Sequence, residues 1–165
     1  MVDSVEKLRL YRRRGAVLDS NLLLLLLLGS YDRNQITNNK RLKKYSPEDF
    51  DLLGKVLKLF VRVVTTPNIL TEVSNLSDAI PEPQRAVYFA KFAKALTLLD
   101  EQHVPSAIAL ASRWARFGLT DAAIAEIARS RYLVLTDDLR LAYALETDGI
   151  RTLNFNELRY VYSQA

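Results

Sequence analysis

Short apolar runs alternate with longer amphipathic segments along most of the chain. The apolar runs predict buried strands, and they lie at Ala16 to Leu18, Val61 to Val64, Tyr132 to Leu135 and Ile150 to Leu153. Their residues are apolar throughout rather than at every second position, which is typical of strands that are covered on both faces. The pattern therefore predicts an α/β fold in which helices cover both sides of a mostly parallel sheet.

Capping residues and glycines mark the expected helix boundaries. Ser46-Pro47 and Thr66-Pro67 each place a capping hydroxyl before a proline, which predicts that helices begin there. Gly29 is predicted to end a helix that begins at Asn21. The same criteria predict helices from Thr66-Pro67 through Leu76, from Thr120-Asp121, from Leu139 to Thr147 with Gly149 behind it, and after a capping Asn156.

Two stretches show a different pattern. The residues from Ser30 to Tyr45 are mostly polar and predict a basic loop or insertion. The region from Pro83 to Phe117 is rich in Ala and Leu, has no β-branched run and is interrupted at Val104-Pro105. Two helices are expected in that region.

Length and composition narrow the classes of function. A chain of 165 residues fits one domain, taken here as residues 1–165. The sequence contains no cysteine and one histidine, which excludes disulfides, thiolate metal sites and multi-histidine zinc sites. Any bound metal must therefore have oxygen ligands. The net charge of +4 mildly favours a polyanionic partner.

The N-terminal region resembles the start of a secretory signal, because Arg12 to Arg14 precede a leucine run from Leu22 to Leu28. Asp19, Ser20 and Asn21 interrupt the apolar stretch, and the run is far shorter than the roughly 20 residues that span a bilayer. We therefore expect a cytoplasmic protein without a membrane partner.

Acidic residues lie where the predicted strands end. Asp19 and the pair Asp137 and Asp138 follow two apolar strands, and ligands of parallel sheets bind beyond such carboxyl ends. Glu72 has apolar neighbours on its helix, so its carboxylate is expected on the core side. Asp121 lies in the first turn of a helix that leads back into the sheet. If these acids converge, a hard cation such as Mg²⁺ or Mn²⁺ must offset their repulsion.

Each acid also has a structural interpretation, which stays open at this point. Asp19 can cap the helix that follows it, and Asp121 is well placed for the dipole of its own helix. Glu72 can be a solvated helix residue. Asp137 and Asp138 can form a turn with a helix cap. The functional interpretation depends on the joint placement of these residues.

Four strings in order along the chain resemble the PIN-domain nucleases: Val17-Leu18-Asp19-Ser20-Asn21, Ile69-Leu70-Thr71-Glu72-Val73, Leu119-Thr120-Asp121-Ala122-Ala123-Ile124-Ala125 and Leu135-Thr136-Asp137-Asp138. The resemblance implies a three-layer α/β/α domain, with an acidic pocket that binds Mg²⁺ or Mn²⁺ and hydrolyses single-stranded or structured RNA.

Carried over by position, the resemblance assigns the metal-binding and catalytic acids to Asp19, Glu72, Asp121 and Asp138, with Asp137 as the alternative to Asp138. It implies that Thr136 and Asn21 support these acids. Many small members of the family are toxins of the virulence-associated protein C type. The resemblance thus implies a metal-dependent endoribonuclease that forms a homodimer and has an antitoxin partner. The chain is longer than that pattern, because the stretch from Ser30 to Tyr45 is inserted.

The basic stretch and two other functions complete the expectations. Lys40, Arg41, Lys43 and Lys44 are candidates for binding RNA phosphates, with a merely solvated charge run as the alternative. A catalytically inactive RNA- or protein-binding module of the same fold is the main alternative function. A phosphoryl-accepting Asp19 is less favoured, because such domains need a lysine near the later strand ends and these strands offer none.

Overall fold

The strands form one all-parallel sheet in the order β3-β2-β1-β4-β5. The computed structural model describes residues 4–163 of the chain. The strands are short and lie at β1 Ala16–Leu18, β2 Val63–Thr65, β3 Asp100–Glu101, β4 Leu133–Thr136 and β5 Thr152–Asn154. This sheet confirms the predicted α/β class and the mostly parallel arrangement.

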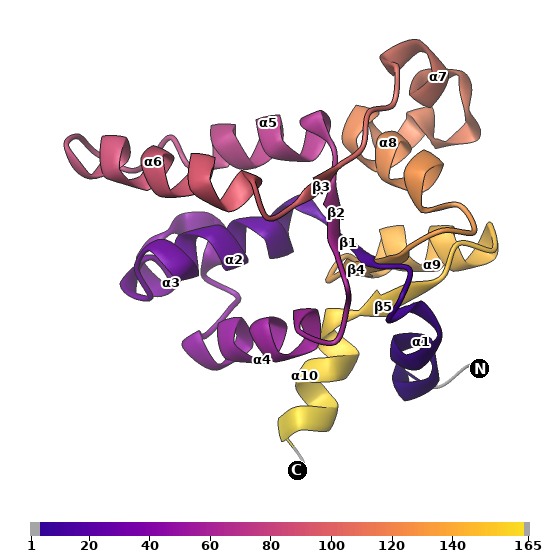
Figure 1. Cartoon of the computed structure of the whole chain (residues 1–165), viewed down its shortest axis with the longest axis horizontal. Coiled ribbons are helices and arrows are strands. Elements are labelled where there is room, and N and C mark those ends of the chain that lie inside the picture. Colours follow the sequence, from indigo (N-terminus) through magenta and orange to yellow (C-terminus); the bar gives the residue numbers. More distant parts are fainter. Residues whose placement is uncertain (1–3, 164–165) are drawn as a thin grey trace.

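Helices lie on both sides of the sheet, as a three-layer α/β/α fold requires (Figure 1). In the view of Figure 1, α2 to α6 lie to the left of the strands, α1 and α7 to α9 lie to the right, and α10 lies below. The helices are α1 Ser4–Tyr11, α2 Ser20–Tyr31, α3 Asn34–Asn38, α4 Pro47–Leu57, α5 Pro67–Leu76, α6 Gln84–Leu96, α7 Ser106–Ala111, α8 Leu119–Ala128, α9 Leu139–Thr147 and α10 Phe155–Ser163. Two 3₁₀ helices, η1 Lys40–Leu42 and η2 Arg113–Phe117, complete the set.

The order in which strands are added to the sheet reverses at β1. Val17 of β1 pairs with Val64 of β2 on one side and with Val134 of β4 on the other. From β1 the chain proceeds to β2 and β3, and it then returns to the opposite edge as β4 and β5. Parallel sheets bind ligands beyond the carboxyl ends of the strands at such a switch point. In this fold the switch point lies between the ends of β1 and β4.

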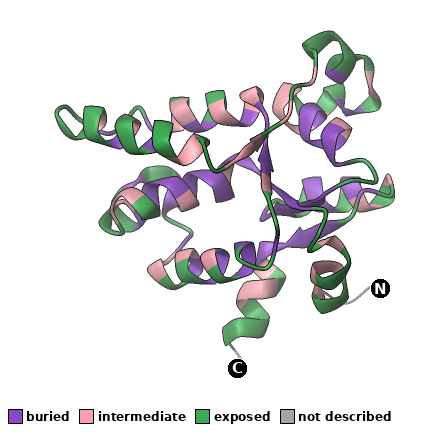
Figure 2. Ribbon diagram, in the orientation of Figure 1, coloured by how far each residue is buried: buried purple, intermediate pink, exposed green. Residues whose placement is uncertain are grey.

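Helix α2 occupies the centre of one helical layer. It contacts α3, α4, α5 and α6, and all of its leucines except the half-buried Leu26 are buried. Figure 2 shows α2 and the strands as mostly buried, whereas the outer face of α6 is exposed. A helix that is apolar all round can be stable only if it is covered on every side. The run from Leu22 to Leu28 is therefore part of the core.

The capping residues predicted for α4 and α5 are confirmed. The Ser46 hydroxyl accepts a hydrogen bond from the Asp49 N–H, and the Asp49 carboxylate accepts one from the Ser46 N–H. This reciprocal pair is a capping box, which satisfies two backbone donors that a helix start would otherwise leave unpaired. The Thr66 hydroxyl likewise accepts from the Ile69 N–H at 3.2 Å.

The prediction that Gly29 ends a helix is wrong. Gly29 is buried inside α2, which continues to Tyr31. A β-carbon at position 29 would lie 2.5 Å from Cδ2 of Phe50. Gly29 is therefore required for the close approach of the Phe50 ring to the α2 backbone rather than for a left-handed turn.

Three other local predictions are corrected by the structure. The stretch from Ser30 to Tyr45 is a helical segment, in which α3 and η1 bury Ile36 and Leu42. The region from Pro83 to Phe117 contains the strand β3 besides its helices. The last helix is capped by Asn154, whose side chain accepts from the Asn156 N–H at 2.9 Å.

None of the helices within residues 4–163 is both long and apolar enough to cross a bilayer.

Candidate functional site

Asp19 joins the ends of β1 and β4. It is the N-cap of α2, where its Oδ1 accepts from the Leu22 N–H at 2.8 Å. Its Oδ2 accepts from the Thr136 hydroxyl and, at 3.3 Å, from the Asp137 N–H. The structural interpretation of Asp19 as a helix cap is therefore confirmed, and the same carboxylate also joins the two strand ends. Its role in metal binding stays a prediction.

Burial makes Asp19 difficult to ionise. The residue is 6% exposed, and burial is the main reason that its pKa rises to about 6 from the usual 3.8. The charge of Asp137 raises this pKa further, whereas hydrogen bonds from Thr136 and from two backbone N–H groups lower it. No lysine or arginine of the described chain forms an ion pair with Asp19.

Glu72 lies near this edge but is not on the core side, so that expectation is wrong. It is exposed on α5, and its Oε2 accepts from the Ser20 hydroxyl at 2.9 Å. The apolar neighbours Ile69 and Val73 fill the core side of the helix, and Glu72 projects along the neighbouring face. The hydrogen bond places its carboxylate beside the first turn of α2, one residue from Asp19.

Asp121 experiences the charges of the other three acids. It lies half-buried in the first turn of α8, and burial is the main cause that raises its pKa to about 7. The carboxylates of Asp19, Glu72 and Asp138 raise this pKa further, and Arg140 lowers it. The pKa of Asp121 therefore depends on three other carboxylates, and we call this set of residues the acidic site: Asp19, Glu72, Asp121 and Asp138.

The two members of the Asp137-Asp138 doublet have different surroundings. Asp137 is buried, and its Oδ2 accepts from the Tyr45 hydroxyl at 2.7 Å and pairs with the Lys44 ammonium group. Asp138 is exposed and caps α9, where its Oδ1 accepts from the Arg140 N–H at 2.8 Å and the Leu141 N–H at 3.0 Å. Asp137 is thus paired with Lys44, although its charge still raises the pKa of Asp19, whereas the charge of Asp138 raises the pKa of Asp121.

Thr136 connects the two strand ends through one hydroxyl group. Its Oγ1 donates to Asp19 and accepts from the Asp138 N–H at 3.0 Å. Thr136 therefore has the geometry of a supporting residue. Asn21 lies half-buried in the first turn of α2, and its side chain makes no hydrogen bond within residues 4–163.

The side chains of the acidic site offer the donor atoms that a hard divalent cation prefers, but not a geometry that encloses one. All four side chains offer carboxylate oxygens, and none of them is paired with a lysine or arginine in the part of the chain that the structure describes. As the side chains stand, no three His, Asp or Glu residues of that part lie close enough together to enclose an ion. Tight coordination would therefore require rotation of side chains such as Glu72 and Asp121.

The basic segment from Lys40 to Lys44 lies beside this edge of the sheet. Lys40, Arg41, Lys43 and Lys44 are all exposed. The segment is held to the sheet by Lys44 and Tyr45, through their contacts with Asp137, and its backbone is bound by Arg159, whose Nη2 donates to the Lys44 carbonyl at 3.0 Å. Sequence patterns did not indicate the contacts that hold this segment to the sheet, because Tyr45 and Asp137 are 92 residues apart in the chain.

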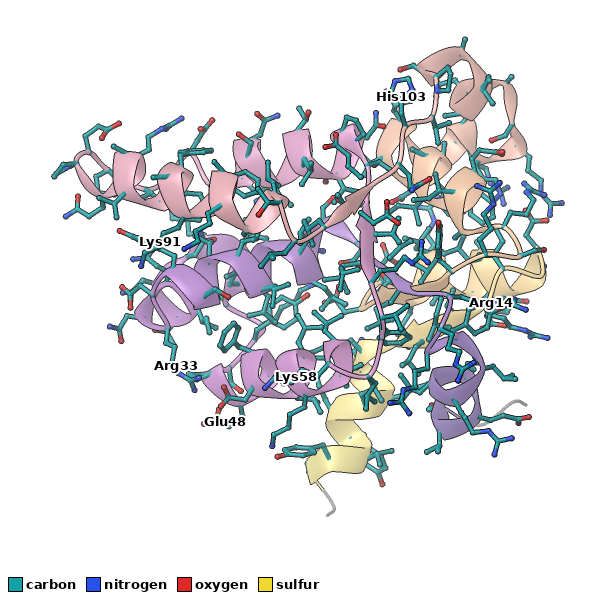
Figure 3. All side chains as sticks on the ribbon, viewed as in Figure 1. Arg14, Arg33, Glu48, Lys58, Lys91 and His103 are labelled. Carbon is teal, nitrogen blue, oxygen red and sulfur yellow. The ribbon has the colours of Figure 1, made fainter. Side chains whose placement is uncertain are left out.

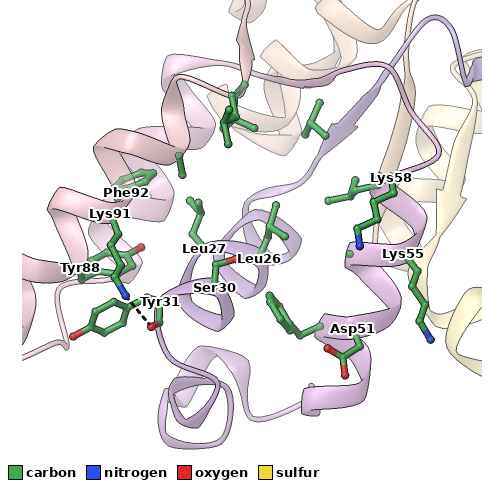
Figure 4. Close-up of a pocket in the computed structure, with 17 residues that line it drawn as sticks. Leu26, Leu27, Ser30, Tyr31, Asp51, Lys55, Lys58, Tyr88, Lys91 and Phe92 are labelled. Carbon is green, nitrogen blue, oxygen red and sulfur yellow. Dashed lines mark hydrogen bonds between the residues drawn. The ribbon is translucent and has the colours of Figure 1, made fainter.

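Two hollows and the single histidine complete the description. A hollow of about 340 Å³ borders Glu72 and is lined by α5 and by Leu119 and Thr120 of α8. A more apolar cavity of about 740 Å³ lies between α2, α4 and α6, with Lys58 on one wall and Lys91 on the other, and none of the four acids lines it (Figure 4). His103 is exposed between β3 and α7, at the periphery of the molecule (Figure 3).

No family model matches this chain, and no curated protein matches it either. Membership of the PIN-domain family therefore stays a prediction that depends on the residues quoted above.

Proposed function

We propose that this protein is a metal-dependent endoribonuclease, in which Asp19, Glu72, Asp121 and Asp138 hold Mg²⁺ or Mn²⁺ and RNA is the substrate. The observation that carries the proposal is the placement of Asp19 and Asp138 at the switch point of a parallel sheet, where their charges and that of Glu72 raise the pKa of Asp121. None of the four carboxylates is paired with a cationic side chain in residues 4–163. Such a cluster is costly unless a cation offsets it.

The residues of the site have separate tasks. A bound divalent cation supplies Lewis acidity toward phosphate oxygens and lowers the pKa of water. Asp19 is kept in one orientation by the Leu22 N–H and the Thr136 hydroxyl. Glu72 and Asp138 are exposed, so a polymer can reach the acidic site from solvent.

Asp121 holds a proton near neutral pH until a cation offsets its neighbours. Because burial and three neighbouring carboxylates raise its pKa to about 7, its carboxyl group binds a proton more readily near neutral pH than an ordinary aspartate does. Ionisation of Asp121 is therefore coupled to cation binding, because the same oxygen atoms cannot hold both a proton and an ion.

The basic segment supplies the contacts that a polyanion needs. Lys40, Arg41 and Lys43 are exposed and have no ion-pair partner within the described residues, so they are available to RNA phosphates. The resemblance extends the proposal to a cytoplasmic homodimer that an antitoxin protein inhibits.

Cleavage of a mixed RNA pool tests the proposal. Wild-type protein is compared with Asp121→Asn and with Glu126→Gln, which changes an acid on the same helix outside the acidic site. We expect cleavage with Mn²⁺ or Mg²⁺, none with chelator, and a loss of at least about a hundredfold in Asp121→Asn, since metal assistance is worth several kcal/mol. Glu126→Gln should cleave as the wild type does.

Absence of cleavage by folded wild-type protein with either metal would overturn the proposal. If that protein still bound RNA or a partner protein, the inactive binding module would replace the nuclease.

A further inference from the structure

Two guanidinium groups flank one aromatic ring at the surface beside α8. The guanidinium carbons of Arg116 and Arg140 lie 5.0 Å and 5.1 Å from the centroid of the half-buried Phe117 ring. Neither arginine has an ion-pair partner among residues 4–163. Their charges are therefore available to a ligand, and the ring holds both in place by cation–π contacts.

Helix α9 adds two exposed apolar side chains to the same region. Tyr143 is 77% exposed and Leu139 is 69% exposed. These residues are four positions apart, so they share one face of the helix. Tyr143 also lines a hollow of about 170 Å³ together with Arg116 and Phe117. We call Arg116, Phe117, Leu139, Arg140 and Tyr143 the arginine–aromatic surface.

This surface begins where the acidic site ends. Leu139 directly follows Asp138, whose carboxylate accepts from the Arg140 N–H at 2.8 Å. The charge of Arg140 lowers the pKa of Asp121. A strand of nucleic acid that reaches the acids can therefore extend directly onto the exposed aromatic and guanidinium groups.

We propose that the arginine–aromatic surface binds unpaired nucleotides of the RNA, with bases stacked on Tyr143 and phosphates bound by Arg116 and Arg140. This inference rests on the proposed function in taking RNA as the ligand. Aromatic side chains stack on bases only where the bases are not already stacked in a duplex, and arginine supplies both charge and a flat face. The surface therefore selects single-stranded RNA beside the acidic site.

Binding is measured in chelator, so that no cleavage occurs. The probe is a fluorescein-labelled single-stranded RNA of 12 nucleotides, with the same sequence in a perfect duplex as the comparison, and anisotropy is the readout. Tyr143→Ala should weaken single-strand binding by about tenfold, because one stacked base is worth about 1–3 kcal/mol. Tyr143→Phe keeps the ring and should bind as the wild type does.

The arginine contacts are tested by the salt dependence. Replacing Arg116 and Arg140 together with Gln should reduce the slope of log affinity against log salt by about 1.4, since each phosphate contact to a single strand contributes about 0.7. The matched controls are Tyr160→Ala, which removes an aromatic side chain 69% exposed on α10, and Arg9→Gln on α1. Both controls should bind like the wild type.

Equal binding of the single strand and the duplex, or unchanged binding by Tyr143→Ala, would overturn this inference. Cleavage assays on the same preparations separate it from the proposed function. If the wild type cleaves RNA and the variants bind it as tightly as the wild type does, the inference about the arginine–aromatic surface fails and the nuclease proposal stands. The expected binding pattern without any cleavage overturns the nuclease proposal and supports a single-strand binding surface.

Discussion

At the scale of single residues, Asp19 has the most demanding position in the protein. It accepts backbone hydrogen bonds as a helix cap, receives the Thr136 hydroxyl, and is almost completely buried. These contacts orient its carboxylate but do not neutralise it, and its pKa stays raised to about 6. The metal-free protein therefore bears a cost for the charge of Asp19 at neutral pH.

This cost predicts a pH-dependent effect of Asp19→Asn on stability. Because the pKa is about 6 in the fold and near 3.8 in the unfolded chain, the stability contribution of wild-type Asp19 is complete below about pH 4 and is lost as the pH rises through 6. Asparagine does not titrate and remains a good helix cap. The free energy of unfolding of the variant should rise relative to wild type across this window, by about 2–3 kcal/mol.

Urea unfolding in chelator at pH 4 and pH 7.5 measures this difference. A difference between variant and wild type that is the same at both pH values would contradict the account of Asp19.

Sequence analysis predicted some site residues because they follow a simple rule of chain geometry. Asp19 and the doublet of Asp137 and Asp138 follow apolar strands, and the carboxyl ends of neighbouring parallel strands meet. The choice of Asp138 within the doublet came from the family resemblance. The sequence left Glu72 with two interpretations, one on the core side and one in solvent, because apolar neighbours on a helix do not determine the side on which one residue projects. The structure supports the solvated one. The pairing of Asp137 with Lys44 and Tyr45 depends on tertiary contacts between distant segments, so it could not be predicted either.

At the scale of elements, the packing of α2 against α4 depends on a glycine. Gly29 of α2 lies against the ring of Phe50, and a β-carbon there would approach that ring to 2.5 Å. Gly54 lies within α4, and a β-carbon at that position would meet no atom within 4 Å. The two helical glycines therefore have opposite surroundings.

Alanine substitutions at these glycines should change stability in opposite directions. Gly29→Ala should destabilise the protein by about 1–3 kcal/mol, because overpacking outweighs the better helix propensity of alanine. Gly54→Ala should stabilise it by about 0.5–1 kcal/mol. Chemical unfolding of both variants checks the pair, and stabilisation by Gly29→Ala would show that the Phe50 ring does not restrict this helix.

Local patterns predicted elements whose ends are fixed by local chemistry. The capping residues Ser46 and Thr66 act within three residues, so their helices were predicted at the correct start. Strand β3 contains only Asp100 and Glu101, and it exists because its backbone pairs with β2. No apolar pattern marks such a strand, so it was missed. The helices α3 and η1 were missed because each is short and is stabilised by burying a single residue, Ile36 or Leu42.

At the scale of the whole molecule, the switch point brings chemistry together from distant parts of the chain. The acids come from the end of β1, from α5, from the start of α8 and from the end of β4. The basic segment and the arginine–aromatic surface both adjoin this edge, through Lys44 and Arg140. In the proposed nuclease, the cationic surfaces attract the polyanion that the acids alone would repel.

The most direct test of this account is a titration of the whole chain with Mn²⁺ near pH 8, in which electron paramagnetic resonance measures the free ion. The account predicts that the wild type and Glu126→Gln remove Mn²⁺ from solution with the same affinity, and that Asp121→Asn binds it at least about tenfold more weakly, because one carboxylate ligand and its charge are lost. Binding that is equally tight in Asp121→Asn, or no binding by the wild type, would contradict the assignment of these four acids as a metal centre.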